Sequence, residues 1–158
     1  MDYEILSRQL IEHTGSLAAE SARRRKNYNF HNLEDRVQRM LNAMEPSTYI
    51  RPHRHINPRK VETFIVLRGK IAVFIFDDDG KITYTHICEP ENDPGIDLKA
   101  GTWHTIVSLE SKTVCFESKD GPYDPFTDKD FAPWAPKEGS EESRAYLENL
   151  RKRIESSC

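Results

Sequence analysis

Short segments in which apolar and polar residues alternate follow one another through the middle of this 158-residue chain. About seven of them lie between residues 46 and 120, and few of the connections between them are long enough to hold a helix. Alternation with a period of two is typical of strands with one buried face, and a run of such strands forms an antiparallel sandwich or barrel. The sequence therefore predicts a mainly β fold over residues 46–120.

Helical patterns flank this region. Apolar residues recur at helical spacing in residues 2–22, and residues 32–44 carry an apolar stripe behind Asn32, a residue type that often caps helices. A proline-rich stretch at 121–139 precedes a further apolar stripe at 141–155. We expect a single domain over residues 1–158 in three parts: a helical N-terminal extension (1–45), a β-barrel (46–120), and the proline-rich segment with a C-terminal helix (121–158).

Composition argues against several classes of function. The chain has 23 basic and 26 acidic residues, a formal net charge of -3, which gives no reason to expect nucleic acid or an anionic membrane as partner. No apolar run approaches the roughly 18 residues of a membrane-spanning helix, and the first residues, Met1 to Glu4, lack a basic leader. The three cysteines form no CxxC pair. We expect a cytoplasmic protein with reduced thiols.

Four residues of the β region have side chains that bind metals. His53 and His55 are two positions apart, so on a strand they share one face. Glu62 begins the next expected strand, and His104 follows Gly101, which permits a tight turn into its strand. Three imidazole nitrogens and one carboxylate oxygen suit a divalent transition metal: iron, manganese, nickel, cobalt or zinc. The pattern predicts one metal site.

The order of these residues resembles the two-part motif of the cupin family, spread over about residues 49–108: His53-x-His55, Glu62, Gly69 and Gly101-x-x-His104. Two features depart from the common motif. Six residues separate His55 from Glu62, and Lys99 stands where a proline is usual. The long spacing leaves open whether Glu62 or Glu117 supplies the carboxylate ligand.

Further stretches resemble the WbuC family of cupin-fold metalloproteins, so that the resemblance covers roughly two thirds of the chain: Arg23–His31, Glu117–Tyr123 and Trp134–Pro136. The resemblance implies a cupin double-stranded β-helix, or jelly-roll barrel, with N-terminal helices and a C-terminal helix. It also implies a bound metal. The family has no settled reaction, and its name points towards surface-polysaccharide metabolism.

Several polar residues are expected beside the metal. Arg51 shares a face with the two histidines and could bind a carboxylate or phosphate by two hydrogen bonds, or form a structural ion pair. Tyr49, one step further out, could donate a proton or pack in the barrel. On the late strand, Glu117 and Lys119 share a face: Glu117 is a candidate catalytic base and Lys119 a candidate substrate ligand, unless this face meets solvent.

A run of four basic residues, 23–26, could reach over the barrel mouth and hold an anionic substrate, although such runs are often only solvated. The candidate substrate-binding residues of this segment are Arg24, Asn27, Asn29 and His31.

Three kinds of function fit these features. The chain could be a metalloenzyme, such as a sugar isomerase or epimerase or a dioxygenase, because the ligand set serves Lewis-acid and redox metals alike. It could be a metal-dependent module that binds a small molecule without changing it. It could also be a structural cupin that pairs through its sheets. We expect a small anionic or sugar-like ligand and a homodimer.

Overall fold

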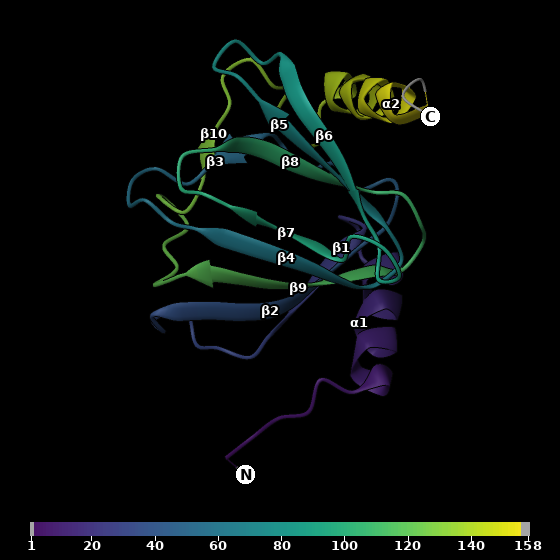
Figure 1. The fold of residues 1–158 in the computed structure, drawn as a ribbon, viewed down its shortest axis with the longest axis vertical. Helices are drawn as coiled ribbons and strands as arrows, with labels where there is room; N and C mark the ends of the chain where they lie inside the picture. The colour runs from purple at the N-terminus through teal and green to yellow at the C-terminus, as the bar shows by residue number, and fades with distance from the viewer. Residues whose placement is uncertain (1, 156–158) are drawn as a thin grey trace.

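Two antiparallel β-sheets face each other in the computed structural model of the chain, which describes residues 2–155 (Figure 1). The first sheet has the strand order β1 (Arg25–Asn29), β2 (Val37–Met44), β9 (Thr113–Asp120), β4 (Glu62–Arg68) and β7 (Gly95–Leu98). The second has the order β10 (Asp130–Phe131), β3 (His53–Arg54), β8 (Trp103–Ser108), β5 (Ile71–Phe76) and β6 (Ile82–Cys88). Helices α1 (Arg8–Glu20) and α2 (Glu141–Glu155) lie at the two ends of the chain.

Neighbouring strands within each sheet are mostly distant in sequence. Strand β9 pairs with β2 and β4, and β8 pairs with β3 and β5, so the chain passes repeatedly from one sheet to the other. This order is that of a jelly roll, in which two sheets enclose one interior. The mainly β, cupin-type fold with helices at the N- and C-terminal ends is therefore confirmed.

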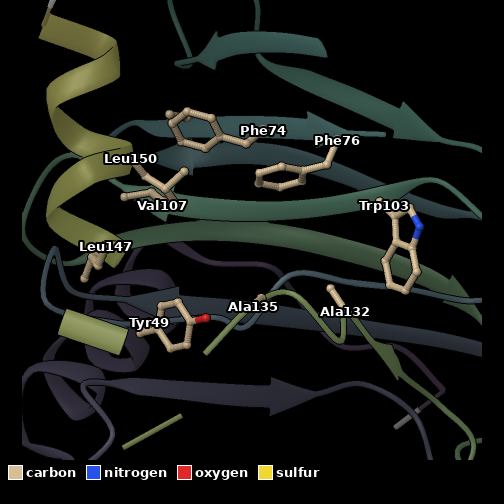
Figure 2. Close-up of a cluster of buried hydrophobic side chains, with 10 residues drawn as sticks. Tyr49, Phe74, Phe76, Trp103, Val107, Ala132, Ala135, Leu147 and Leu150 are labelled. Atoms are coloured by element: carbon tan, nitrogen blue, oxygen red, sulfur yellow. The ribbon is translucent and has the colours of Figure 1, made fainter. Parts of the chain in front are cut away.

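The alternation along the central strands divides the apolar residues between two layers. Val73 of β5 and Ile106 of β8 belong to the cluster between the sheets. Their neighbours Phe74 and Val107 point to the opposite side, where they pack with residues of α2 such as Leu150 (Figure 2). Strand β5 is therefore almost entirely buried, because the interior covers one of its faces and α2 covers the other.

Helix α1 covers the outer side of the first sheet. Ala18 packs in one cluster with Leu41 of β2 and Val114 of β9. Gly15 lies in the same helix, and a Cβ atom there would stand 3.2 Å from the Cβ of Lys112, so the glycine permits the close approach. Within residues 2–155, neither helix is long and apolar enough to cross a membrane.

The helix expected over residues 32–44 is wrong. This segment is a turn followed by β2, and only residues 8–20 of the expected helical extension form a helix. Asn32 and Asp35 form the turn, in which the backbone N–H of Asn32 donates to the Asp35 carboxylate at 3.1 Å. Strand β2 is buried on both faces, and the apolar residues of its two faces, taken together, are spaced like those of an amphipathic helix. The barrel accordingly begins with β1.

The other expected elements agree closely with the structure. Strands β4 through β9 all lie within the expected β region, 46–120, and the C-terminal helix spans the predicted residues, 141–155. Gly80, in the turn between β5 and β6, has a φ of +84°, which glycine adopts without strain. Residues 49–51 lie in the same expected β region but form no strand, because β3 begins only at His53.

Candidate metal centre

Four buried side chains converge between the two sheets. His53 on β3 lies opposite His104 on β8 in the register of the second sheet. Glu62 is the first residue of β4 in the facing sheet, and His55 follows β3 directly. One potential ligand atom from each of these four residues lies within 4.8 Å of the others. The structure thus brings together all four residues of the predicted metal site.

The backbone around His55 and Gly101 helps to explain this convergence. Gly101, with a φ of +88°, forms the turn before β8, and its N–H donates to the carbonyl of His55 at 3.0 Å. The long spacing between His55 and Glu62 is taken up by a turn in which Ile56 and Arg59 form an isolated bridge. The unusual spacing therefore still delivers Glu62 to the histidines.

Each of the three imidazole rings faces a backbone carbonyl with its Nδ1 atom. The Nδ1 of His53 lies 2.9 Å from the carbonyl oxygen of Arg51, and that of His104 lies 2.9 Å from the carbonyl oxygen of Thr102. The Nδ1 of His55 contacts the carbonyl oxygen of Asp128. Since a carbonyl oxygen can only accept, Nδ1 carries the hydrogen in each ring, which in the neutral imidazole leaves the Nε2 lone pair free.

These lone pairs meet the Glu62 carboxylate without hydrogen bonds. The Nε2 atoms of His55 and His104 lie 3.3 Å and 3.0 Å from Glu62 Oε2. All three atoms are buried and lack a hydrogen-bond partner. Neutral imidazole nitrogens and a carboxylate oxygen are all acceptors, so they do not satisfy one another. A cation among them would, and three nitrogens with one oxygen could hold a transition metal.

The pKa values of two of these groups favour the protonation states that metal ligands need. Burial lowers the pKa of His53 well below its usual value, and the nearby His104 and Lys129 add to this effect. Burial by itself would raise the pKa of Glu62, but contacts with His104 and His55 outweigh it, and the pKa lies well below the usual range. A neutral His53 and an ionised Glu62 are both ready to bind a metal.

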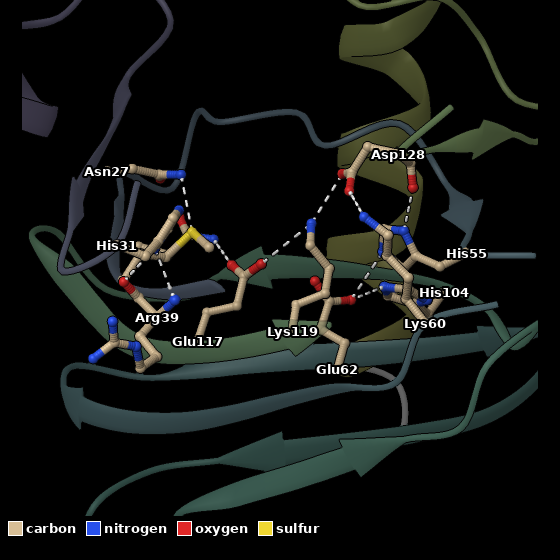
Figure 3. A network of polar contacts seen from close by, with 12 residues as sticks. Asn27, His31, Arg39, His55, Lys60, Glu62, His104, Glu117, Lys119 and Asp128 are labelled. Atoms are coloured by element: carbon tan, nitrogen blue, oxygen red, sulfur yellow. Dashed lines mark hydrogen bonds and ion pairs between the residues drawn. The ribbon is translucent and has the colours of Figure 1, made fainter. Parts of the chain in front are cut away.

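A buried ionic network supports His55 from behind. The Asp128 carboxylate accepts from Lys60 Nζ at 3.2 Å and from Lys119 Nζ at 2.9 Å (Figure 3). The backbone carbonyl of Asp128 is the one that orients His55. Burial by itself would raise the pKa of Asp128, but the two lysines and His55 lower it below its usual value. The Asp128 carboxylate is thus ionised and lies beside the centre.

Glu117 lies in the wall of the cavity next to the four-residue group. Its Oε2 accepts a hydrogen bond from Asn42 at 2.8 Å, and its Oε1 lies 3.9 Å from Lys119 Nζ (Figure 3). Burial, together with the charge of Glu62, raises the pKa of Glu117 to about 8. The carboxylate of the four-residue group is therefore that of Glu62, whereas Glu117 is placed to hold or release a proton near neutral pH.

A cavity of about 790 Å³ extends from this centre towards β1 and β2. It contains most of the residues that the sequence suggested for substrate binding or catalysis: Arg51, Asn27, Asn29, His31, Lys119 and Glu117. Only some of them have side chains free for a ligand, since His31 Nδ1 accepts from the backbone N–H of Arg39 at 2.8 Å. The expected polar face of β9 does line the barrel.

Two predicted site residues lie elsewhere. The Tyr49 hydroxyl donates to the carbonyl of Pro136 at 2.8 Å, and its ring belongs to the cluster beneath α2 (Figure 2). Burial raises the pKa of this hydroxyl, so it is a poor proton donor or acceptor near neutral pH. The Arg24 side chain contacts the carbonyl of Ala19, and its neighbours Arg23 and Arg25 line the cavity instead. Tyr49 therefore has a packing role.

Sequence reasoning missed two residues of the site, Asp128 and Lys129. Both belong to the proline-rich segment, which has no periodicity from which a facing direction could be inferred. The two-residue strand β10, which pairs Phe131 with His53, brings this segment to the centre. The stretch also contains Asp124, Asp130, Lys137 and Glu138, so its composition gave no signal that would single out Asp128 and Lys129.

Comparisons with known proteins agree with this fold. A family model described as "Domain of unknown function (DUF6016)" matches residues 6–88. No curated protein matches the chain. A crystal structure of CapF with the inhibitor 3-isopropenyl-tropolone is 23% identical, with a TM-score of 0.58, and the match covers 70% of this chain and 32% of CapF.

A second structure, of the capsular polysaccharide assembling protein CapF from Staphylococcus aureus, is 22% identical with a TM-score of 0.57 over the same shares. The chain thus spans about a third of the length of CapF, and at this identity the likeness concerns the fold alone. The family model, by contrast, covers more than half of the sequence. The chain therefore belongs to the family described as the domain of unknown function DUF6016.

Proposed function

We propose that this chain is a metal-dependent cupin of the WbuC type, which holds one divalent transition metal on His53, His55, Glu62 and His104. Its cavity takes a small anionic or carbohydrate-type molecule. Support for this comes from the cavity wall, to which three of the four proposed ligands, His53, Glu62 and His104, contribute. A molecule in the cavity therefore meets the metal directly.

The observation that carries this proposal is the common orientation of the three histidines. Each Nδ1–H is engaged by a different carbonyl, from Arg51, Thr102 and Asp128. This second layer of hydrogen bonds fixes the tautomer in which Nε2 is a ligand. In an ordinary buried ion pair, one imidazole would donate a hydrogen bond to Glu62 through its Nε2. Here an imidazole could do so only if it lost its Nδ1 contact or became charged.

The chemistry of the site follows from the residues around the metal. A divalent transition metal bound there would act as a Lewis acid towards a carbonyl or hydroxyl oxygen, or as a redox centre. Glu117, with its pKa of about 8, holds or accepts a proton within the cavity. Lys119 stays charged, since nearby acids raise its pKa although burial alone would lower it. The Phe131 ring lies beside His53, with 6.3 Å between the ring centres.

Two resemblances suggest which substrates to test first. The WbuC family name points towards surface polysaccharides, and the printed name of CapF refers to assembly of a capsular polysaccharide. The likeness to CapF establishes no shared activity, because it is a likeness of fold. We accordingly propose sugar derivatives as the first molecules to test, and a ligand recovered unaltered would indicate a binding module in place of an enzyme.

Metal content tests the proposal. The full chain, purified without a chelator or a metal-affinity resin, is expected to contain about one equivalent of a transition metal by mass spectrometry. The variants His53→Ala and His104→Ala should lose it while keeping their β-rich circular dichroism. His13→Ala, which removes an exposed histidine on α1, is the matched control and should retain the metal. A wild-type chain that takes up no metal even after reconstitution would contradict the proposal.

A further inference from the structure

The cationic residues of the cavity differ in whether they have an acidic partner. Arg23 and Arg25 both contact Glu138, at 2.9 Å and 3.0 Å. Lys119 contacts Asp128 at 2.9 Å. Lys129 makes no hydrogen bond or ion pair with any residue of the described chain, although it also lines the cavity. Two ammonium groups at the cavity wall, those of Lys26 and Lys129, therefore lack a counter-charge among the described residues, and of the two only Lys129 is partly buried.

The position of Lys129 is set by strand β10. Phe131, two residues further on, is the register partner of His53, so the chain carries Lys129 past the metal centre. Its charge acts on His53, and in turn it feels the charges of Glu117 and Glu62. Burial lowers the pKa of Lys129, and the positive charge of Lys119 adds to this. An anion from solvent or from a ligand would counteract both the burial of the ammonium group and its repulsion by Lys119.

A second cation on the same side of the centre has unused donors. Arg51 Nη2 donates to the carbonyl of Ala132 at 2.8 Å, and the guanidinium lies 5.3 Å from the centre of the Phe131 ring. Arg51 Nε is buried and has no hydrogen-bond partner. The guanidinium is thus held in place by contacts that do not neutralise its charge. Arg51 contacts Phe131, which follows Lys129 by two residues, and all three residues line the cavity together with His53.

The part of the cavity further from the metal has a different character. Its wall carries four amide side chains, from Asn27 and Asn29 on β1 and from Gln38 and Asn42 on β2. Amides both donate and accept hydrogen bonds, so a row of them suits hydroxyl groups. A volume of about 790 Å³ is within the range of small-molecule sites. The cavity thus has unpaired cations beside the centre and a row of amides along β1 and β2, where Arg25 and Lys26 also contribute to the wall.

We infer that Lys129 and Arg51 together form an oxyanion subsite beside the metal centre, and that the cavity takes a hydroxylated molecule bearing a carboxylate or phosphate group. The oxyanion lies between the two cations, and the hydroxyl groups lie along the amides of β1 and β2. This inference rests on the proposed function, because the metal compensates the acidic charge of Glu62 that would otherwise repel the anion.

Calorimetric titration of the metal-loaded full chain tests the subsite. The probes are D-glucuronate, glucose 6-phosphate, uncharged glucose and inorganic phosphate. At least one charged sugar is expected to bind ten times more tightly than glucose, and whichever of the two binds more tightly identifies the oxyanion as carboxylate or phosphate. Lys129→Met should weaken that binding about 10- to 100-fold, as expected for loss of a hydrogen bond to a charged group.

Two matched variants make the result specific. Lys129→Arg keeps the charge and should retain most of the affinity, whereas Lys152→Met removes an exposed charge on α2 and should change nothing. Equal binding of glucose and both charged sugars, or unchanged affinity in Lys129→Met, would overturn the subsite. If inorganic phosphate bound as tightly as glucose 6-phosphate, the inference that the ligand is a hydroxylated molecule would be overturned.

Metal content, measured on the same samples, separates this inference from the proposed function. Lys129→Met is expected to keep its full equivalent of metal, because Lys129 contacts none of the four ligands. A wild-type chain without metal contradicts the proposed function. A chain with metal but without preference for charged sugars contradicts only the subsite.

Discussion

The ammonium group of Lys119 lies 2.9 Å from Asp128 Oδ2, and both side chains are almost completely buried. Asp128 also holds Lys60 at 3.2 Å. Strand β9 and the loop that leads into β4 are in this way tied to the segment that follows β9 by a single carboxylate. The same residue orients His55 through its backbone carbonyl.

Replacement of Asp128 by alanine should therefore affect both stability and metal binding. It leaves two buried lysines without their acid, and loss of one partner of a buried pair costs about 3–5 kcal/mol in the free energy of unfolding. Alanine keeps the backbone carbonyl that contacts His55, so metal binding should weaken only through displacement of this segment, by less than the roughly 10- to 100-fold expected when such a partner is removed. Urea denaturation and metal titration measure the two effects. Asp79→Ala, in the exposed β5–β6 turn, should change neither, and equal behaviour of both variants would refute the role of Asp128.

The variants Glu62→Gln and Glu117→Gln test which of the two carboxylates binds the metal, a choice that the sequence left open. Only Glu62 has an oxygen within the four-residue group, so Glu62→Gln should lose most of its metal. Glu117→Gln should keep it, since the amide can still contact Asn42. Cobalt titration, followed by visible absorption, reports ligand geometry directly. Retention of the cobalt spectrum in Glu62→Gln and its loss in Glu117→Gln would reverse the assignment.

Phe74 should be essential for the packing of α2 on the second sheet. Its side chain is fully buried, and its truncation to alanine is expected to cost about 3–5 kcal/mol in the free energy of unfolding. Phe126 is 93% exposed, and Phe126→Ala should stay within about 0.5 kcal/mol of wild type. Urea denaturation of the two variants makes the comparison. A small effect of Phe74→Ala would mean that α2 is not held by this cluster.

Glu138 should contribute to stability in a pH-dependent way. A hydrogen bond from Arg23 lowers its pKa and outweighs the opposing effect of burial, and Arg25 adds to the lowering. A lowered carboxyl pKa stabilises the fold at pH values above the pKa of the unfolded chain, about 4.3, and this contribution disappears as the pH falls through the folded value.

The contribution is small because these side chains are partly exposed. Glu138→Gln should be less stable than wild type by at most about 1 kcal/mol at pH 7, and the difference should shrink when both are denatured below pH 4. Chemical denaturation at the two pH values measures it. A difference that grows with acidity would contradict this assignment.

The strands from Glu62 to Asp120 were predictable because most have one face towards the interior and a second face with different surroundings. The two kinds of surroundings give these strands a sequence pattern with a period of two. The four residues of the candidate metal site were predictable from similar signals, since His53 and His55 are spaced for one face, Glu62 begins β4 and His104 is the second residue of β8. Strand β2 was not, because it has few of the β-branched and aromatic residues that mark the equally buried β5, and its apolar residues, such as Met40 and Leu41, fall at helical spacing. The roles of Asp128 and Lys129 depend on a long-range return of the chain that no local pattern encodes.

The segment 121–139 crosses the metal centre after the barrel strands are complete. It supplies the carbonyl that sets the tautomer of His55, the lysine at the cavity wall and the aromatic ring beside His53. None of these residues belongs to the four-residue group, whose members all precede the segment. A change in this one stretch of sequence would therefore alter the orientation of His55 and the charge of the cavity wall together.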